Sequence, residues 1–360
     1  MYSPFPYERF ASSSSFYGRE AEIKYLRKFA DESNNLVLFS KRRLGKSSLV
    51  QEAFRESEYL FIYCDIFDIT SKEEFANKLL KAASNAIKGN IQEIALQLRS
   101  IFKRVIPDFS IDSSGVPHIK PSTRSLDFEE MMDDFFTLLF QLSQKQKVVL
   151  AIDEFQQIAS LGDARVDATL RKYMQQNKNI SYFFLGSKRH LLNTLFEYHS
   201  PLYEMATPME LHSMLLDDVY RYTAEHLHIA KDVVSYAYEL CDGETKLLQH
   251  IFHILYMSKR ENEIKTPDID KALEEILLAK SSSYRVIFES FSQYQKKVFK
   301  LLSQNDKNYF YKEVLEAYKI SKGTALSSLK QLYKREIVDK ENEKWFIPDR
   351  AFELWGKSLE

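Results

Sequence analysis

The stretch Leu36-Val37-Leu38-Phe39-Ser40-Lys41-Arg42-Arg43-Leu44-Gly45-Lys46-Ser47 predicts most of the fold. Its first four residues are apolar without a helical period, which is typical of a buried strand. The residues from Ser47 to Arg55 then have the spacing of a helix. A strand, a short loop and a helix N-terminus bring backbone N–H groups and a lysine together, as a phosphate chain requires. We therefore expect a phosphate-binding loop at residues 40–47.

The loop assigns a role to each of its polar residues. We expect Lys46 to reach the β- and γ-phosphates and the Ser47 hydroxyl to ligate Mg²⁺. Ser40 stands where the full Walker A pattern has glycine, which tolerates dihedrals that serine does not. The competing interpretation is a strand–turn–helix junction with solvated lysines. The residues expected around the nucleotide are Ser40, Lys41, Arg42, Arg43, Leu44, Gly45, Lys46, Ser47 and Ser48.

A second apolar run, Val148 to Ile152, ends in Asp153-Glu154 and reads as a Walker B strand. Asp153 would hold Mg²⁺ through water, and Glu154 would polarise the attacking water. An Asp-Glu pair taken alone favours a helix N-cap instead. The two motifs together, on strands in the expected order, favour a nucleotide site.

A third strand end carries polar and cationic side chains in Gly186-Ser187-Lys188-Arg189. Open α/β sheets bind ligands at the carboxyl ends of their strands. Ser187 would sense the γ-phosphate, and Lys188 or Arg189 would stabilise charge that develops during transfer. A solvated basic helix start explains these residues equally well. Lys46, Glu154 and Arg189 are thus the expected catalytic set.

Strands and helices alternate through the first two hundred residues, which predicts an α/β fold with a doubly wound parallel sheet. The additional strands are expected at Tyr59–Tyr63 and Tyr182–Leu185. Around them we expect helices at Glu20–Ala30, Ser71–Ile87 and Asp127–Gln144, and a further helix from the Walker B strand to Arg171. The segment from Ile106 to Arg124 loses this periodicity, and Ser113-Ser114-Gly115 within it suggests the turn of a small hairpin.

Strand signals stop after about Pro201, and residues 215–280 read as helices, one of them opening at Thr266-Pro267. From about Tyr284 the order becomes three helices and two short strands, around Ile337-Val338 and Trp345-Ile347, which is typical of a winged helix. We therefore expect three domains: a P-loop core at 1–205 with an insertion at about 106–124, a helical lid at 206–282 and a winged helix-turn-helix at 283–360.

Composition is ordinary for a soluble protein, with 44% hydrophobic and 28% charged residues. The net charge of −1 means that any nucleic-acid binding needs a local basic patch. The two cysteines, Cys64 and Cys241, are far apart in the sequence and fit a reducing cytoplasmic compartment better than a disulfide framework. The N-terminus lacks the pattern of a signal peptide, and no apolar run is long enough to span a bilayer.

Four segments resemble the archaeal-type ATPases, a group within the STAND/AAA+ superfamily that is also spread among bacteria. They are Phe16–Glu20, the Arg-Arg-x-Gly-Lys-Ser loop, Asp153–Gln156, and Gly186–His190 followed by Pro201-Leu202-Tyr203. In the C-terminal part the likeness continues at Tyr294–Val298, Ile347–Asp349 and Phe352–Trp355. It covers nearly the full length except Ile106–Arg124, and it implies ATP and Mg²⁺ as ligands.

The resemblance also implies roles outside the phosphate loop. Phe16, Tyr17, Gly18 and Arg19 would contact adenine, and the helical middle would act as a lid. Gly243–Gln249 resembles the family's Gly-x-Pro segment, which approaches the base, with Thr245 where proline is usual. Met205 stands where many members carry arginine. Together with Ser40, these departures bear on the rate of hydrolysis more than on the fold.

Two weaker signals are interpreted as structural. His226 with His228, and His250 with His253, lack the cysteines or carboxylates that would complete a tetrahedral metal shell, so we expect packing or surface histidines. Cys64 has no nearby histidine or helix N-terminus that would form a thiolate, so we expect an inert buried thiol.

The predicted winged helix raises the possibility of DNA as a partner. We expect its third helix to bury Ala325, Leu326, Leu329 and Leu332 and to turn Lys322, Thr324, Ser327, Ser328, Lys330, Gln331 and Lys334 outward. From Tyr284 onward there are 15 Lys and Arg against 11 Asp and Glu, a net charge of +4. The expected wing tip, Asp339–Lys344, has mixed charge and suits a groove poorly. The alternative is a domain that packs on the core and relays nucleotide state.

Three functions remain open on the sequence: a slow ATPase that acts as a nucleotide-dependent switch, a pseudo-ATPase that holds nucleotide structurally, and a DNA-binding regulator. Protein partners and self-association also remain open, and we expect no membrane partner.

Overall fold

The computed structural model describes residues 3–11, 13–87, 109–111, 117–119, 127–177, 179–187, 189–259, 261–304, 309–341 and 344–359. The chain divides into two compact units. The sheet unit comprises Arg19–Lys41 and Lys46–His212. The helical unit comprises Met1–Gly18, Arg42–Gly45 and Ser213–Glu360. The phosphate loop therefore contributes to both: its tip is counted with the helical unit and its flanks with the sheet unit.

The sheet unit is built on a five-stranded sheet in the order β2-β5-β6-β1-β7, and every neighbouring pair is parallel. This arrangement confirms the predicted α/β class with a doubly wound parallel sheet. The strands are β1 (Leu36–Phe39), β2 (Leu60–Asp65), β5 (Val148–Asp153), β6 (Ile180–Gly186) and β7 (Thr207–Glu210).

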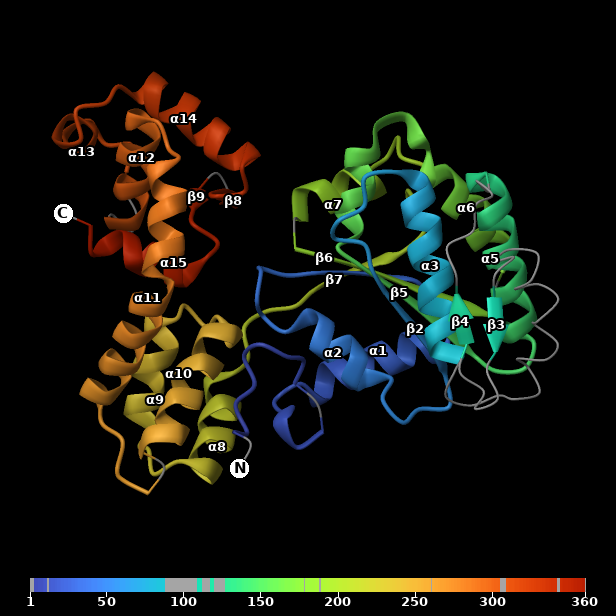
Figure 1. The fold of residues 1–360 in the computed structure, drawn as a ribbon, viewed down its shortest axis with the longest axis horizontal. Helices are drawn as coiled ribbons and strands as arrows, with labels where there is room; N and C mark the ends of the chain where they lie inside the picture. The colour runs from blue at the N-terminus through green and yellow to red at the C-terminus, as the bar shows by residue number, and fades with distance from the viewer. Residues whose placement is uncertain are drawn as a thin grey trace. The chain divides into compact units, whose positions relative to one another are not determined.

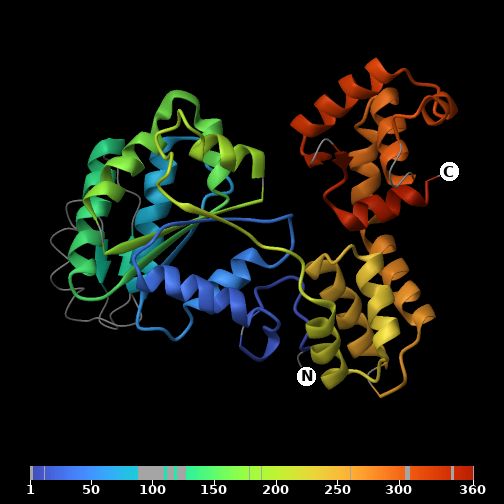
Figure 2. The ribbon, with the colours of Figure 1, turned by 180° about the vertical axis from the view of Figure 1, so that it is seen from behind.

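Helices cover both faces of this sheet (Figures 1 and 2). On one face lie α1 (Glu20–Asp31) and α2 (Lys46–Ala53), and on the other lie α3 (Lys72–Ile87), α5 (Phe128–Ser143) and α6 (Val166–Gln176). The helix α7 (Arg189–Phe196) also belongs to the described part of this unit.

Alternate residues of the central strands supply the two cores. Leu150 and Ile152 of β5 join the large cluster formed with α3 and α5, as do Tyr182 and Phe184 of β6. Phe183 points to the opposite face, where its ring lies 5.6 Å from that of Phe54. All seven residues of β6 are buried, as expected for a strand covered on both sides.

The four predicted strands are confirmed: β1 has the predicted bounds, and the ends of β2, β5 and β6 differ from the prediction by one or two residues. The strand β7 was not predicted. This edge strand pairs only with β1, and Thr207 and Pro208 in it are exposed. Proline has no backbone N–H to donate to a sheet, so within sheets it occurs on edge strands. The sequence Thr-Pro-Met-Glu also lacks the alternation of apolar and polar residues that would predict a strand. The strand is held instead from its start, where the Asn35 amide donates to the Met205 carbonyl (2.9 Å).

The segment after β5 also differs from the prediction. In place of one helix to Arg171, the chain forms the 3₁₀ segment η2 (Phe155–Ala164) and then α6. Glu154 has φ of 57°, in the left-handed region, and this turns the chain sharply at the end of β5. The predicted hairpin is present as the antiparallel pair β3 (Phe109–Ile111) and β4 (Pro117–Ile119), while its turn at Ser113–Gly115 lies outside the described residues.

The helical unit begins with four helices, α8 (Leu216–His226), α9 (Lys231–Leu240), α10 (Thr245–Lys259) and α11 (Thr266–Glu289). The predicted start at Thr266-Pro267 is confirmed, and α11 continues without a break past the expected boundary at residue 282. The N-terminal segment also belongs here. Phe5 is fully buried against the rings of Tyr222 and Phe252, and the Tyr222 hydroxyl donates to the Pro4 carbonyl (2.9 Å).

The C-terminal elements follow the predicted order with one addition. They are α12 (Gln293–Gln304), α13 (Lys312–Ala317), α14 (Lys322–Lys334), β8 (Asp339–Glu341), β9 (Lys344–Phe346) and α15 (Arg350–Lys357). The short 3₁₀ helix η1 (Ser13–Ser15) lies near the N-terminus. The strand β8 and the first residue of β9 occupy positions that were expected to form the wing tip. The prediction that Asp339–Lys344 is a wing tip outside the strands was therefore wrong. The expectation for α14 was wrong at Ser328, which is buried among Ala325, Leu329 and Leu332. The lid and winged-helix assignments stay predictions.

Among the helices of the described residues, none is both long enough and apolar enough to cross a membrane.

Two glycines of the helical unit allow an internally controlled stability test. Gly243 has φ of 66°, and a Cβ there would lie 2.7 Å from the Ser213 hydroxyl oxygen. Gly323 lies in α14, where a Cβ would meet nothing closer than 3.9 Å. We expect Gly243→Ala to lower the free energy of unfolding by about 1–3 kcal/mol, and Gly323→Ala to raise it by about 0.5–1 kcal/mol. Denaturant unfolding measures both, and equal effects would contradict the assigned backbone conformations.

Candidate functional site

The parallel sheet brings several predicted site residues to one edge. In register, the end of β1 at Phe39 pairs with Gly186 of β6, and Asp65 of β2 pairs with Asp153 of β5. The polar residues that follow these strands therefore leave the sheet at its carboxyl edge. This is the edge at which open α/β sheets bind ligands.

Ser47 and Asp153, the two predicted magnesium ligands, are in direct contact. Ser47 lies in the first turn of α2, and its hydroxyl donates to Asp153 Oδ2 at the end of β5. Asp153 is 3% exposed. The Tyr63 hydroxyl of β2 donates to the same carboxylate oxygen at 2.6 Å, and burial beside Asp153 raises the pKa of Tyr63. The carboxylate thus ties α2, β2 and β5 together.

Lys46 is buried, with 7% of its surface exposed. This contradicts the alternative of a junction with solvated lysines. No ion pair of Lys46 is found within the part of the chain that the structure describes. A buried ammonium without an anionic partner is costly, so its position favours an anionic ligand.

Glu154 contacts the end of the next strand. Its backbone N–H donates to Asp153 Oδ1 (2.8 Å), and the Ser187 hydroxyl lies 3.4 Å from Glu154 Oε2. The Gln156 side-chain amide donates to the same Oε2. Glu154 makes no side-chain cap for η2, which weakens the N-cap interpretation of the Asp-Glu pair. The structure thus brings together Glu154 and Ser187, which were both predicted site residues, and adds Gln156 to them.

The basic residues after Ser187 are only partly described. Lys188 lies outside the described residues, and Arg189 begins α7 without a described side chain. The role expected for Arg189 therefore stays a prediction.

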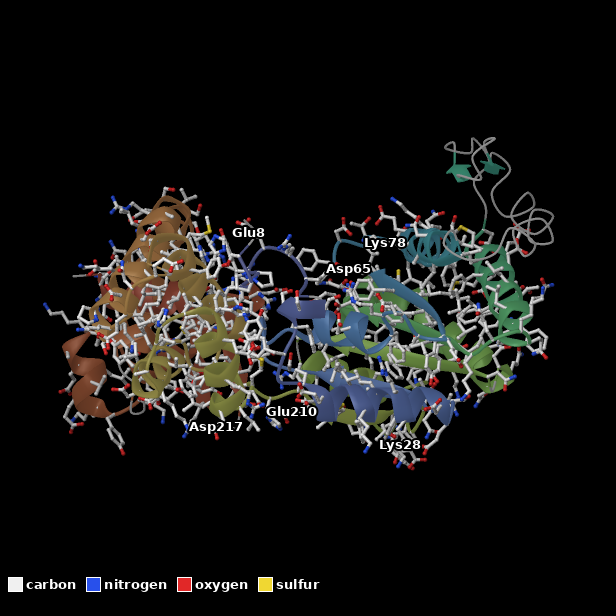
Figure 3. The ribbon with its side chains drawn as sticks, turned by 90° about the horizontal axis from the view of Figure 1, so that it is seen from below. Glu8, Lys28, Asp65, Lys78, Glu210 and Asp217 are labelled. Carbon is white, nitrogen blue, oxygen red and sulfur yellow. The ribbon has the colours of Figure 1, made fainter. Side chains whose placement is uncertain are left out.

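Asp65, at the end of β2, takes part in a separate network on the surface. Lys78 of α3 lies beside Asp65 (Figure 3) and donates to the Asp65 carbonyl (3.1 Å). It also forms an ion pair with Asp68. The Asp65 carboxylate accepts the Phe67 backbone N–H (2.9 Å). These contacts order the β2–α3 connection beside the predicted site.

The loop tip, Arg42–Gly45, makes its contacts within the helical unit. Arg43 has φ of 67°, and its guanidinium forms a bidentate ion pair with Asp349, with Nη1 2.5 Å from Oδ1 and Nη2 2.8 Å from Oδ2. Glu244 lies 3.7 Å from the same guanidinium. The Arg43 carbonyl accepts the Lys246 backbone N–H (3.2 Å) at the start of α10.

Arg43, Asp349 and Glu244 shift one another's pKa values. Burial alone would lower the pKa of Arg43, but its hydrogen bonds to Asp349 raise it overall. Burial opposes ionisation of Asp349, yet the Arg43 hydrogen bonds hold the pKa of that carboxyl below its ordinary value. Burial raises the pKa of Glu244 to about 7, because the attraction of Arg43, 3.7 Å away, only partly offsets the effect of burial. The Glu244 carboxyl therefore changes its ionisation near neutral pH, and the net charge of the cluster of Arg43, Asp349 and Glu244 changes with it.

The segment expected to contact adenine divides between the units. In the helical unit, Tyr17 stacks on Tyr222, with ring centroids 3.9 Å apart, and accepts a hydrogen bond from the Gln249 amide (2.9 Å). In the sheet unit, Arg19 pairs with Glu22 (2.7 Å) and donates to the His212 carbonyl (2.7 Å). Tyr17 and Gln249 therefore meet, as two segments implied to lie near the base should.

The histidines and cysteines have ordinary structural surroundings. His250 stacks on Tyr7 at 3.8 Å, and burial lowers its pKa to about 4. His226 packs edge-on against Phe5. Within the described residues, no group of three or more His, Cys, Asp or Glu residues is placed to hold a metal ion. Cys64 and Cys241 are free and buried, and burial raises the pKa of the Cys64 thiol to about 12.

A family model agrees with this geometry. Residues 16–251 match the model described as an ATPase domain predominantly from Archaea. The chain belongs to this ATPase family. The match includes the phosphate loop, the Asp153-Glu154 strand and the Gly186-Ser187 strand end, and it ends within α10. No curated protein sequence matches the chain significantly.

Solved structures have the same fold as this chain. The Walker-type ATPase PABY2304 of Pyrococcus abyssi matches with a TM-score of 0.67 and 18% identity, covering 99% of this chain and 100% of that one. The Orc1 protein of Aeropyrum pernix in complex with DNA matches with a TM-score of 0.52 and 14% identity, covering 95% and 92%. The ADP form of Aeropyrum pernix Orc2 matches at 0.51 and 10%, covering 93% and 90%.

Sequence analysis missed two polar residues of the site. Tyr63 was assigned only to a strand, although it lies on the half-buried face of β2, two residues before the end of the strand, where a polar side chain can reach the carboxyl edge of the sheet. Gln156 was quoted only as part of the family likeness. It lies two residues beyond Glu154, and its contact depends on the left-handed turn at Glu154, which the sequence did not indicate.

The Glu244 carboxyl predicts a pH dependence of stability. Its pKa is raised from 4.5 to about 7, so the folded state favours the protonated form. Stability from this group is full below about pH 4.5 and is lost as pH rises through about 7. We expect the free energy of unfolding to fall by about 3 kcal/mol over this range through Glu244. Urea unfolding at several pH values measures it.

Glu244→Gln should remove this part of the pH dependence, while the exposed Glu239→Gln should leave it unchanged. If Glu244→Gln and wild type show parallel pH profiles, the assigned protonation of Glu244 is wrong.

Proposed function

We propose that the chain binds ATP with Mg²⁺ and hydrolyses it slowly to ADP and phosphate. The contact that supports this most directly is the hydrogen bond from Ser47, at the N-terminus of α2, to Asp153 at the end of β5. It joins the phosphate loop to the Asp-Glu strand, as a nucleotide site requires. The buried Lys46 and membership of an ATPase family support the same reading.

In the proposed reaction, water attacks the γ-phosphorus while the bond to the β–γ bridging oxygen breaks, and ADP leaves with that electron pair. The Glu154 carboxylate orients the water and accepts its proton. Lys46 and the N–H groups at the start of α2 neutralise the β- and γ-phosphates. Ser187, within reach of Glu154, would sense the γ-phosphate, and Arg189 would stabilise the developing charge.

The oxygen atoms of Ser47 and Asp153 fit a magnesium ion. Mg²⁺ prefers one or two carboxylates together with hydroxyl, water and phosphate oxygens, so a cluster of three acidic or histidine residues is not needed. Ser47 would bind the ion directly and Asp153 through water. When bound, Mg²⁺ neutralises charge on the phosphate oxygens.

We further propose that the ATPase acts as a nucleotide-dependent switch of the STAND/AAA+ type in the cytoplasm. Loss of the γ-phosphate would remove contacts at Lys46 and Ser187 that favour one state. Residues 206–282 would serve as the lid and residues 283–360 as a winged helix. Lys41, Arg42, Arg43, Leu44, Gly45 and Ser48 would line the phosphates, and Phe16 to Arg19 would contact adenine.

Two substitutions separate binding from turnover. We expect Lys46→Ala to weaken binding of Mg-ATP by about 10–150-fold, because a charge-assisted contact is lost. Glu154→Gln should preserve binding and lower phosphate release by about 10²–10⁴-fold, because the base is lost. Titration calorimetry and a phosphate-release assay measure the two effects.

The exposed residues Lys81 and Glu130 supply matched controls, and Lys81→Ala and Glu130→Gln should behave as wild type. Tight nucleotide binding with no phosphate release from the wild type would indicate a pseudo-ATPase. No heat on titration with Mg-ATP would overturn the proposal altogether.

DNA binding is a second candidate, favoured by one face of α14. Lys322, Lys330 and Lys334 are exposed on this helix, while Ala325, Leu329 and Leu332 are buried beneath it. The fold is also similar to that of Aeropyrum pernix Orc1, whose structure is a complex with DNA. Cations on one face of a helix suit the phosphate backbone of a duplex.

Charge reversal tests this candidate. We expect Lys322→Glu, Lys330→Glu and Lys334→Glu together to lower the affinity for duplex DNA at least tenfold and to flatten its dependence on salt. The control reverses three exposed lysines of the sheet unit, Lys24, Lys28 and Lys81. Fluorescence anisotropy over a salt series measures both. Equal losses in the two triple variants would rule out a specific role for α14.

A further inference from the structure

Gln156 is a buried polar residue to which the proposed reaction gives no role. It is 2% exposed, and its amide nitrogen donates to Glu154 Oε2. A carboxylate only accepts hydrogen bonds, so the nitrogen must face Glu154 and the amide oxygen must face away. That oxygen, Oε1, has no hydrogen-bond partner among the described residues. An unpaired buried carbonyl costs stability, so an apolar residue would suit the position better unless the N–H group is needed.

The backbone on both sides of Gln156 fixes where its amide lies. Glu154 adopts the left-handed conformation, which a residue other than glycine keeps only when its surroundings impose it. The next residue, Phe155, is fully buried, and its ring lies 4.3 Å from that of Phe184 on β6. The turn is thus anchored against β6, and Gln156 follows it directly.

The end of β6 is shaped to accept the Gln156 side chain. A Cβ on Gly186 would lie 2.3 Å from Gln156 Oε1 and 2.5 Å from Leu192 Cδ1. Real Cβ atoms do not approach other atoms so closely, so the space occupied by the amide exists only because residue 186 is glycine. Gln156 is therefore packed between Glu154 and the strand end that carries Ser187.

Among the described residues, the hydrogen bonds to the Glu154 carboxylate fall on one of its two oxygens. Gln156 donates to Oε2, and the Ser187 hydroxyl lies 3.4 Å from the same atom. No side-chain hydrogen bond to Oε1 is found within the described part of the chain. A carboxylate held by one oxygen keeps the other available for a proton.

We propose that Gln156 is a positioning residue for hydrolysis, holding Glu154 through Oε2 so that Oε1 accepts the proton of the attacking water. This inference rests on the proposed function, in which Glu154 is the base. Gln156 itself touches neither nucleotide nor water. Its effect on the rate comes through the orientation of Glu154.

The decisive variant is Gln156→Met, which keeps the length and volume of the side chain, removes the N–H donor and also removes the unpaired carbonyl. We expect an unchanged or higher melting temperature, a kcat about 10–100-fold lower and a KM within threefold of wild type. A fall in kcat with KM and stability preserved is what the loss of a positioning contact predicts, and a loss of folding would not produce it.

Two further variants complete the test. Gln156→Glu keeps the shape but replaces the N–H donor with a second carboxylate that repels Glu154, so kcat should fall at least as far as in Gln156→Met. Gln157→Met makes the same change at the neighbouring, half-buried residue, for which the described residues show no side-chain hydrogen bond to Glu154, and should behave as wild type.

The outcomes separate this inference from the proposal on which it rests. A Gln156→Met protein with wild-type kcat would overturn the positioning role while leaving the ATPase in place. A wild type that releases no phosphate would overturn the proposed function and this inference with it. A Gln156→Met protein with reduced kcat, preserved KM and a preserved melting temperature would support the role.

Discussion

The Asp153 carboxylate is the group on which the rest of the sheet unit's candidate site depends. It accepts hydrogen bonds from Ser47 on α2 and Tyr63 on β2, and it also binds the backbone N–H of Glu154. Three elements that are distant in the sequence are thereby held at one edge of the sheet. Because Asp153 is almost fully buried, these donors are needed to stabilise its charge. The same contacts orient the helix that carries Lys46 and the turn that carries Glu154.

Much of this arrangement was predictable, because it follows from local patterns. Short apolar runs followed by Gly-Lys-Ser and by Asp-Glu identify two strands, and the helices between strands require parallel pairing. Parallel pairing then places the polar ends of β1, β5 and β6 together without any knowledge of contacts. The pairing of Ser47 with Asp153, and of Ser187 with Glu154, follows from this topology alone.

What could not be predicted depends on long-range contacts or on unusual backbone conformations. β7 contains Pro208 and has an exposed edge, so it exists only because β1 offers it a partner. Tyr63 and Gln156 act through contacts fixed by the sheet register and by the turn at Glu154. In the helical unit, Arg43 pairs with Asp349, which lies 306 positions away in the chain, and no sequence period reports such a contact. Phe5 is a buried anchor of the helical unit, and the sequence around it has no periodicity that indicates this.

The central claim is that Ser47 and Asp153 face a magnesium-bound triphosphate. A crystal structure with manganese and a non-hydrolysable ATP analogue tests it, since the anomalous signal locates the metal independently of the phosphates. We predict one manganese ion bonded to the Ser47 hydroxyl oxygen, facing Asp153, with the terminal phosphate between Lys46 and Glu154. A nucleotide bound elsewhere, or a metal ion that neither bonds to the Ser47 hydroxyl oxygen nor faces Asp153, would contradict the account.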